Sequence, residues 1–116
     1  MTARGQVTMR EVGGVPVVEG AGEIDLTNAH EFEAVLNQAA RADRGRVVVS
    51  LMKTTYLDSQ GVRVLFTVGE RLATMRQRLL IVAPTGGAPR RILEISGADS
   101  AFLIFDSVEA ALSETA

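Results

Sequence analysis

The fold is decided by one stretch of the chain, Arg46-Val-Val-Val-Ser-Leu-Met-Lys-Thr-Thr-Tyr-Leu-Asp-Ser-Gln-Gly-Val-Arg-Val-Leu-Phe66. It opens with three consecutive valines, and a β-branched run of this kind is typical of a buried strand. After the polar segment 58–61, apolar residues recur with the spacing of a helix. One stripe of an amphipathic helix is predicted from Val62, Leu65, Phe66, Gly69, Leu72 and Ala73. The stretch therefore predicts a buried strand, a short polar turn and a helix.

The turn between this strand and this helix carries Asp58 and Ser59, and we expect the helix N-cap at or beside them. The first N–H groups of a helix lack intrahelical partners and lie at the positive end of its dipole. A hydroxyl at this place is exposed, held by a rigid element, and positioned where an attached phosphate is tolerated. Local sequence alone favours simple capping, because Asp and Ser are preferred there for capping alone.

Length and composition predict one globular domain, because the chain has 116 residues, of which 47% are hydrophobic and 22% charged. Aromatic residues make up only 4% and the net charge is −2, which disfavours a nucleic-acid partner. No apolar run approaches the roughly 20 residues of a membrane helix, and no cysteine can form a disulfide or a zinc–thiolate site. We expect a single domain over residues 1–116, located in the cytoplasm, with no membrane partner and no bound cofactor or metal.

A β-hairpin is predicted at the N-terminal side. Residues 7–12 alternate between apolar and polar types, Gly13-Gly14 signals a turn, and residues 15–19 form the returning strand. Pro16 is expected near the start of that strand or on an edge, because proline cannot donate to a ladder. We expect residues 20–25 to connect this strand to the first helix.

The first helix is predicted from a capping box made by Asn28 and Glu31, and the polar loop 41–45 ends it. Its buried face is expected to consist of Phe32, Val35, Leu36 and Ala39. Asp25, just ahead of it, is equally well explained as a turn or cap residue.

The C-terminal third predicts two more strands and two more helices. Residues 79–83 form an apolar strand, residues 90–96 a short helix, residues 101–105 a last strand, and residues 108–113 a final helix. The complete order is β-β-α-β-α-β-α-β-α. This alternation predicts an α/β fold with a mixed sheet, whose parallel members are joined by right-handed crossovers.

Nothing in the sequence predicts catalysis. His30 is the only histidine, and no cysteine or paired carboxylate accompanies it. Ser59 lies in no Gly-x-Ser-x-Gly elbow, and the chain has no Gly-x-x-x-x-Gly-Lys loop for a nucleotide. We therefore expect a protein that is not an enzyme.

Three segments in order resemble motifs of the STAS domain family, and above all of its stand-alone anti-sigma factor antagonists. Leu57-Asp-Ser-Gln-Gly61 resembles the central motif, and Gly22-Glu-Ile-Asp25 resembles the family's Gly-(Glu)-Leu-Asp turn. Ser96-Gly97, followed by Phe102-Leu-Ile-Phe-Asp-Ser107, resembles the C-terminal segment. The resemblance covers nearly the whole chain and implies that the helices lie mainly on one side of the sheet.

The resemblance also implies a function. The family's phosphorylated serine falls on Ser59, and the turn at Asp25 lies beside it. The unphosphorylated surface would bind an anti-sigma factor and so release the sigma factor that it holds. That partner would be a serine kinase with ATP bound on the partner, and a phosphoserine phosphatase would reverse the phosphorylation. The partner-binding residues carried over are Asp25, Asp58, Ser59, Gln60, Gly61 and Arg63.

The chain departs from the family pattern at three places. Gln60 replaces the usual second Ser or Thr, Arg63 stands where the family usually has Gly, and Ser50 with Met52-Lys53 replaces a common Asp/Asn-Leu strand end. Two alternatives therefore stay open. One is a STAS subunit that docks onto a transporter or a stressosome-type complex without phosphorylation. The other is a ligand-binding sensor, which the low aromatic content disfavours.

Overall fold

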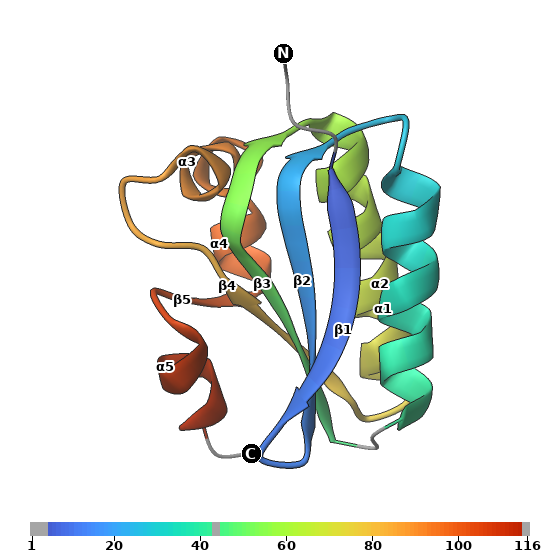
Figure 1. Cartoon of the computed structure of the whole chain (residues 1–116). Helices are drawn as coiled ribbons and strands as arrows, with labels where there is room; N and C mark the ends of the chain where they lie inside the picture. The colour runs from blue at the N-terminus through green and yellow to red at the C-terminus, as the bar shows by residue number, and fades with distance from the viewer. Residues whose placement is uncertain (1–4, 43–44, 115–116) are drawn as a thin grey trace.

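The chain folds into an α/β domain with a five-stranded mixed sheet, seen in a computed structural model that describes residues 5–42 and 45–114 (Figure 1). Its elements are β1 (Gln6–Val12), β2 (Val15–Ile24), α1 (Ala29–Ala42), β3 (Arg46–Leu57), α2 (Ser59–Thr74), β4 (Arg78–Val82), α3 (Ala88–Ile95), α4 (Ala98–Ala101), β5 (Leu103–Phe105) and α5 (Val108–Leu112). The predicted fold class and element order are confirmed, with α4 as one short addition. Residues 43–44 of the predicted loop 41–45 lie outside the described part.

The strands follow one another across the sheet in the order β1-β2-β3-β4-β5. Only the β1–β2 pair is antiparallel, and the other pairs are parallel. Gly13 and Gly14 join β1 to β2 with φ angles of 58° and 82°. A turn with two successive positive φ angles favours glycine, so the predicted hairpin is confirmed with its physical reason.

Two apolar clusters cover the two faces of the sheet. The larger one contains Phe32 and Leu36 of α1, Leu65 of α2, Leu93 of α3 and Ala98 of α4. The smaller one lies on the other face, where α5 contributes the buried Ala111. Figure 1 shows α1 and α2 side by side, with α5 across the sheet from them. The helices thus lie mainly on one side, as the resemblance implied.

Strand β2 is longer than predicted, because residues 20–24 continue it instead of forming a connection. Its register against β3 shifts between Glu19 and Ala21 and again between Gly22 and Glu23. At the first shift the Thr54 hydroxyl donates to the carbonyl of Gly20 over 2.8 Å. Glycines that resemble turn signals in sequence can therefore mark bulges, where the strand bends without ending.

The buried face of α2 is wider than the predicted stripe. Val64 and Val68 are buried as well as Val62, Leu65 and Leu72. Ala73, which the spacing placed on this face, is exposed. The difference arises because α2 packs against both α1 and the sheet, so it needs an apolar arc broader than a single row.

Candidate functional site

The parallel pairing of β2 and β3 brings two separate turns together. Ile24 and Leu57 are paired as the last residues of these strands, and Asp25 and Asp58 follow them directly. The N–H of Asp58 donates to the carbonyl of Ile24 over 3.1 Å. The carboxyl ends of parallel strands meet at one edge of a sheet, which is the usual place for a binding site in an open α/β fold. Figure 1 shows the loop into α1 and the start of α2 at this edge.

Asp58 is the N-cap of α2 and also holds the neighbouring loop. One carboxylate oxygen, Oδ1, accepts from the N–H groups of Gln60 at 2.9 Å and Gly61 at 3.1 Å. The other, Oδ2, accepts from the N–H of Leu26 at 3.1 Å. The predicted cap is therefore confirmed. A single side chain also fixes the start of α2 relative to the loop between β2 and α1.

The loop of residues 25–28 is shaped by its own side chains. Asp25 Oδ1 accepts from the N–H of Thr27 at 2.9 Å and from its hydroxyl at 2.5 Å, so Asp25 makes an Asx turn. The side chain of Asn28 accepts from the N–H of Asp25 at 2.9 Å and donates to the carbonyl of Glu23 at 2.8 Å. The predicted capping box at Asn28 is therefore wrong, because its side chain faces back toward β2.

Ser59 is the first residue of α2 and is exposed. Its hydroxyl makes no hydrogen bond with any residue in the described ranges 5–42 and 45–114. By contrast, the adjacent carboxylate of Asp58 accepts from three backbone N–H groups. The hydroxyl is thus exposed and unbonded at this end of the helix, accessible to a partner or a modifying enzyme.

Gly61 has a packing role that the sequence did not indicate. A Cβ at this position would lie 2.5 Å from Leu57 Cδ1 and 3.1 Å from Ile24 Cγ2. Both of these side chains are at most 1% exposed, so they have little room to move away. The first turn of α2 therefore lies directly on the ends of β2 and β3, and glycine permits that approach.

A groove of about 410 Å³ runs between the N-terminal halves of α1 and α2, next to Ser59. Arg63, one of the predicted site residues, is exposed and lines it together with the half-buried Gln60. The remaining lining residues are Leu26, Ala29, His30, Glu33, Val64 and Thr67. Leu26 is 71% exposed, which is unusual for a leucine held in a defined turn. The sequence did not single out Leu26, although an apolar residue directly after the Asp25 turn was the available signal.

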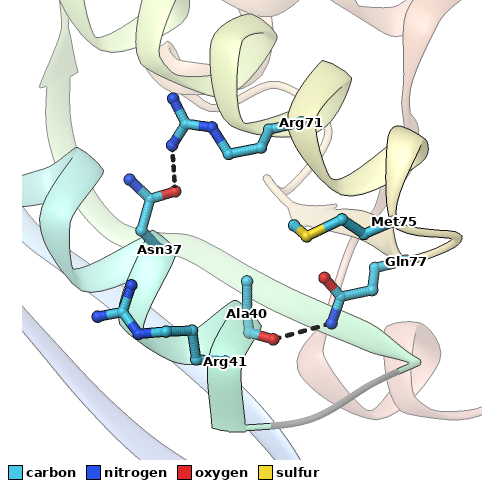
Figure 2. A pocket seen from close by; sticks show the side chains of 6 residues that line it. All are labelled: Asn37, Ala40, Arg41, Arg71, Met75 and Gln77. Carbon is cyan, nitrogen blue, oxygen red and sulfur yellow. Dashed lines mark hydrogen bonds between the residues drawn. The ribbon is translucent and has the colours of Figure 1, made fainter.

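A second hollow of about 560 Å³ lies at the opposite ends of α1 and α2 (Figure 2). Figure 2 shows Arg71 donating to Asn37 Oδ1, a bond of 2.7 Å, and Gln77 donating to the carbonyl of Ala40 over 2.8 Å. Arg41 and Arg71 belong to the last turns of their helices, where positive charge complements the helix dipole. Their placement is explained by this local stabilisation.

Asp106 follows β5 and has its pKa held below its ordinary value of 3.8. The main cause is the Thr85 hydroxyl, which donates to Asp106 Oδ1 over 2.7 Å, followed by the Thr85 N–H at 2.8 Å. The Arg90 guanidinium lies 3.7 Å from the same oxygen and adds a smaller electrostatic contribution. This cluster ties the end of β5 to the loop after β4. It shares no residue with the surface at Ser59.

The chain matches the family model described as the STAS domain over residues 6–111. It belongs to the STAS domain family, and the family prediction is confirmed.

Relatives of this chain carry the name of one kind of regulator. This chain is 34% identical over 108 residues to BtrV of Bordetella bronchiseptica, which is named as an anti-sigma factor antagonist. The match covers 91% of this chain and 90% of BtrV. It is 28% identical to the anti-sigma-F factor antagonist RsfB of Mycobacterium tuberculosis, over 91% of this chain and 85% of RsfB. The crystal structure of an anti-sigma factor antagonist from Mycobacterium paratuberculosis is 26% identical and superposes with a TM-score of 0.87, covering 97% of both chains. These names describe regulators, not enzymes, in agreement with the prediction from sequence.

Two further observations concern the described residues only. None of their helices combines the length and apolar character that a bilayer crossing requires. No three His, Asp or Glu side chains of residues 5–42 and 45–114 are grouped as metal ligands.

Proposed function

We propose that this chain is an anti-sigma factor antagonist whose binding to its partner is ended by phosphorylation of Ser59. One observation carries the proposal: an exposed, unbonded serine hydroxyl lies beside Asp58, which fixes both the helix start and the loop bearing Leu26. A partner would contact the surface made by Asp25, Asp58, Ser59, Gln60, Gly61 and Arg63. Gly61 is buried, so its contribution to this surface would be indirect: it lets the first turn of α2 pack closely on the ends of β2 and β3.

Electrostatics favours a switch that acts on the complex more than on the fold. A phosphate at Ser59 adds about −1.5 to −2 charges beside Asp58 and near Asp25. Interaction of this phosphate with the dipole of α2 stabilises the free phosphorylated protein by only about 0.3–1 kcal/mol. Desolvation and like-charge repulsion in a docked complex would cost several kcal/mol. Since each 1.4 kcal/mol is a factor of ten in affinity, phosphorylation would weaken binding by orders of magnitude.

The proposed partner is an anti-sigma factor that is itself a serine kinase and carries the ATP. The absence of a Gly-x-x-x-x-Gly-Lys loop in this sequence supports placing the nucleotide on the partner. A phosphoserine phosphatase would restore the binding form. These events would occur in the cytoplasm.

The test is a binding titration against the organism's kinase-type anti-sigma factors. It compares the wild type with Ser59→Ala and Ser59→Glu, and maps phosphate on the wild type after incubation with ATP. We expect the wild type and Ser59→Ala to bind alike, Ser59→Glu to bind at least tenfold more weakly, and phosphate to map to Ser59.

If all three proteins bind alike and no phosphate appears, the switch is refuted and Ser59 is only a helix residue. A pull-down would then decide for the alternative function by recovering transporter or stressosome-type subunits in place of a kinase-type anti-sigma factor.

A further inference from the structure

At the start of α2, two of the backbone groups that would hold a phosphate on Ser59 are already occupied. The N–H groups of Gln60 and Gly61 already donate to Asp58 Oδ1, at 2.9 and 3.1 Å. These are the first-turn donors that an anion at a helix N-terminus would otherwise take. The carboxylate that occupies them also repels the phosphate. The backbone therefore offers little to balance a phosphoserine here, and a positive side chain would supply most of the counter-charge.

Arg63 is placed to be that partner. It follows Ser59 by four residues on α2, and side chains with this spacing face each other across one helical turn. Its side chain is exposed, and it has no ion-pair partner among the described residues. In contrast, Lys53, Arg71, Arg78 and Arg90 each lie within 4.0 Å of a carboxylate.

The carboxylates near the groove have other partners, so they leave Arg63 available for a phosphate. Glu33 of α1 lines the same groove, but its carboxylate lies 3.7 Å from Arg71. Asp58 already accepts from three backbone N–H groups, and Asp25 is bonded to Thr27. Besides Arg63 and Glu33, the only titratable side chain of the described residues that lines the groove is that of His30. No second carboxylate of these residues therefore competes for Arg63 within it.

We propose that Arg63 is the counter-charge of phosphoserine 59 and clamps its phosphate across the first turn of α2. A planar guanidinium can bind two phosphate oxygens at once, which a lysine cannot do with the same geometry. The clamp would favour the dianionic phosphate at neutral pH and hold it over the surface that the partner needs. It rests on the proposed function for the occurrence of phosphate at Ser59, and it assigns to Arg63 a role in the phosphorylated state.

The experiment uses the full chain with phosphoserine incorporated site-specifically at position 59, so that no kinase is required. The phosphate is titrated with pH by ³¹P NMR in the Arg63 protein, in Arg63→Gln and in Arg63→Lys. Arg41→Gln is the matched control, because Arg41 is likewise an exposed arginine without an ion-pair partner among the described residues, and it lies in the last turn of α1, far from Ser59. Histidine titrates in the same pH range as phosphoserine, so the series is repeated with His30→Gln.

We expect the acid dissociation constant of the phosphoserine to fall about threefold in Arg63→Gln, since the lost cation no longer favours the dianion. Arg63→Lys should give a dissociation constant between those of the Arg63 protein and Arg63→Gln, and Arg41→Gln should match the Arg63 protein. In the unsubstituted chain, the Nε–H signal of Arg63 should move downfield on phosphorylation. No change in Arg63→Gln, or an equal change in Arg41→Gln, would overturn the clamp.

The two proposals fail separately in these experiments. If Ser59 is never phosphorylated by an anti-sigma factor, the proposed function fails, whereas the NMR titration still reports on Arg63. If the NMR titration shows no effect of Arg63, the clamp fails while the binding switch stands.

Discussion

Asp58 concentrates several stabilising bonds in one side chain. It accepts from three backbone N–H groups, two in the first turn of α2 and one at Leu26. We expect Asp58→Ala to lower the free energy of unfolding by about 1–3 kcal/mol, because it leaves these donors without their partner. The free energy of unfolding of Asp58→Asn should lie between those of the wild type and Asp58→Ala. Its amide oxygen can cap the helix, whereas its NH₂ group cannot accept from the N–H of Leu26.

Urea denaturation of the unphosphorylated proteins measures this order. Equal stability of Asp58→Ala and the wild type would show that water replaces the carboxylate at no cost, contrary to the assigned role.

Gly61 lies where helix propensity and packing make opposite predictions. An alanine is worth up to about 1 kcal/mol more than glycine in a helix interior. Its Cβ would nevertheless meet Leu57 Cδ1 at 2.5 Å within the core. We expect packing to prevail, so that Gly61→Ala destabilises the fold by about 1–3 kcal/mol. Gln60→Ala, which adds no atoms to the core, is the control in the same denaturation series; a more stable Gly61→Ala would contradict this close approach.

At the scale of elements, the loop between β2 and α1 presents Leu26 as an anchor for the partner. Because Leu26 is 71% exposed, Leu26→Ala should change the stability by no more than about 0.5 kcal/mol. If the leucine is buried on docking, its loss should weaken anti-sigma factor binding roughly tenfold or more.

Calorimetric titration of both proteins measures this change in affinity. Met75→Ala is the control, because Met75 is half exposed but caps the far end of α2. Equal losses of affinity in the two variants would mean that the affinity depends on exposed apolar surface in general and not on a contact with the loop.

The elements themselves were largely predictable, because Val47–Val49 and the helical spacing after Ser59 are strong local signals. The end of β2 was not predictable, since Gly20 and Gly22 occur in bulges as readily as in turns. Leu26 and Asp58 are 32 residues apart, and their contact depends on the register of two parallel strands, which no local pattern encodes. For the same reason the groove and the exposed Leu26 emerged only from the structure, whereas the resemblance alone had placed Asp25 beside Ser59.

At the scale of the whole molecule, the depressed pKa of Asp106 predicts how stability depends on acid. A carboxyl whose pKa is lower in the folded chain than in the unfolded chain stabilises the fold fully above its unfolded pKa. That contribution is lost as the pH falls through the lower, folded pKa. The stability advantage of the wild type over Asp106→Asn should therefore be constant near neutrality and disappear below the ordinary value of 3.8.

Denaturant unfolding between neutral and strongly acidic pH checks this dependence. Thr85→Val removes the hydroxyl that lowers the pKa most, so it should make the acid-dependent part smaller. A pH-independent difference between the wild type and Asp106→Asn would contradict the assignment.

The two ends of the described chain emerge at opposite ends of the molecule (Figure 1). A Cβ at Gly5 would lie 2.4 Å from Asn28 Nδ2, so β1 begins against the loop that presents Leu26. A reporter protein or solid support attached ahead of Gly5 would therefore crowd the surface around Ser59. Glu114 pairs with Arg78 at the start of β4, at the edge of the sheet opposite Ser59, so the same attachment beyond Glu114 would leave that surface accessible to a large partner.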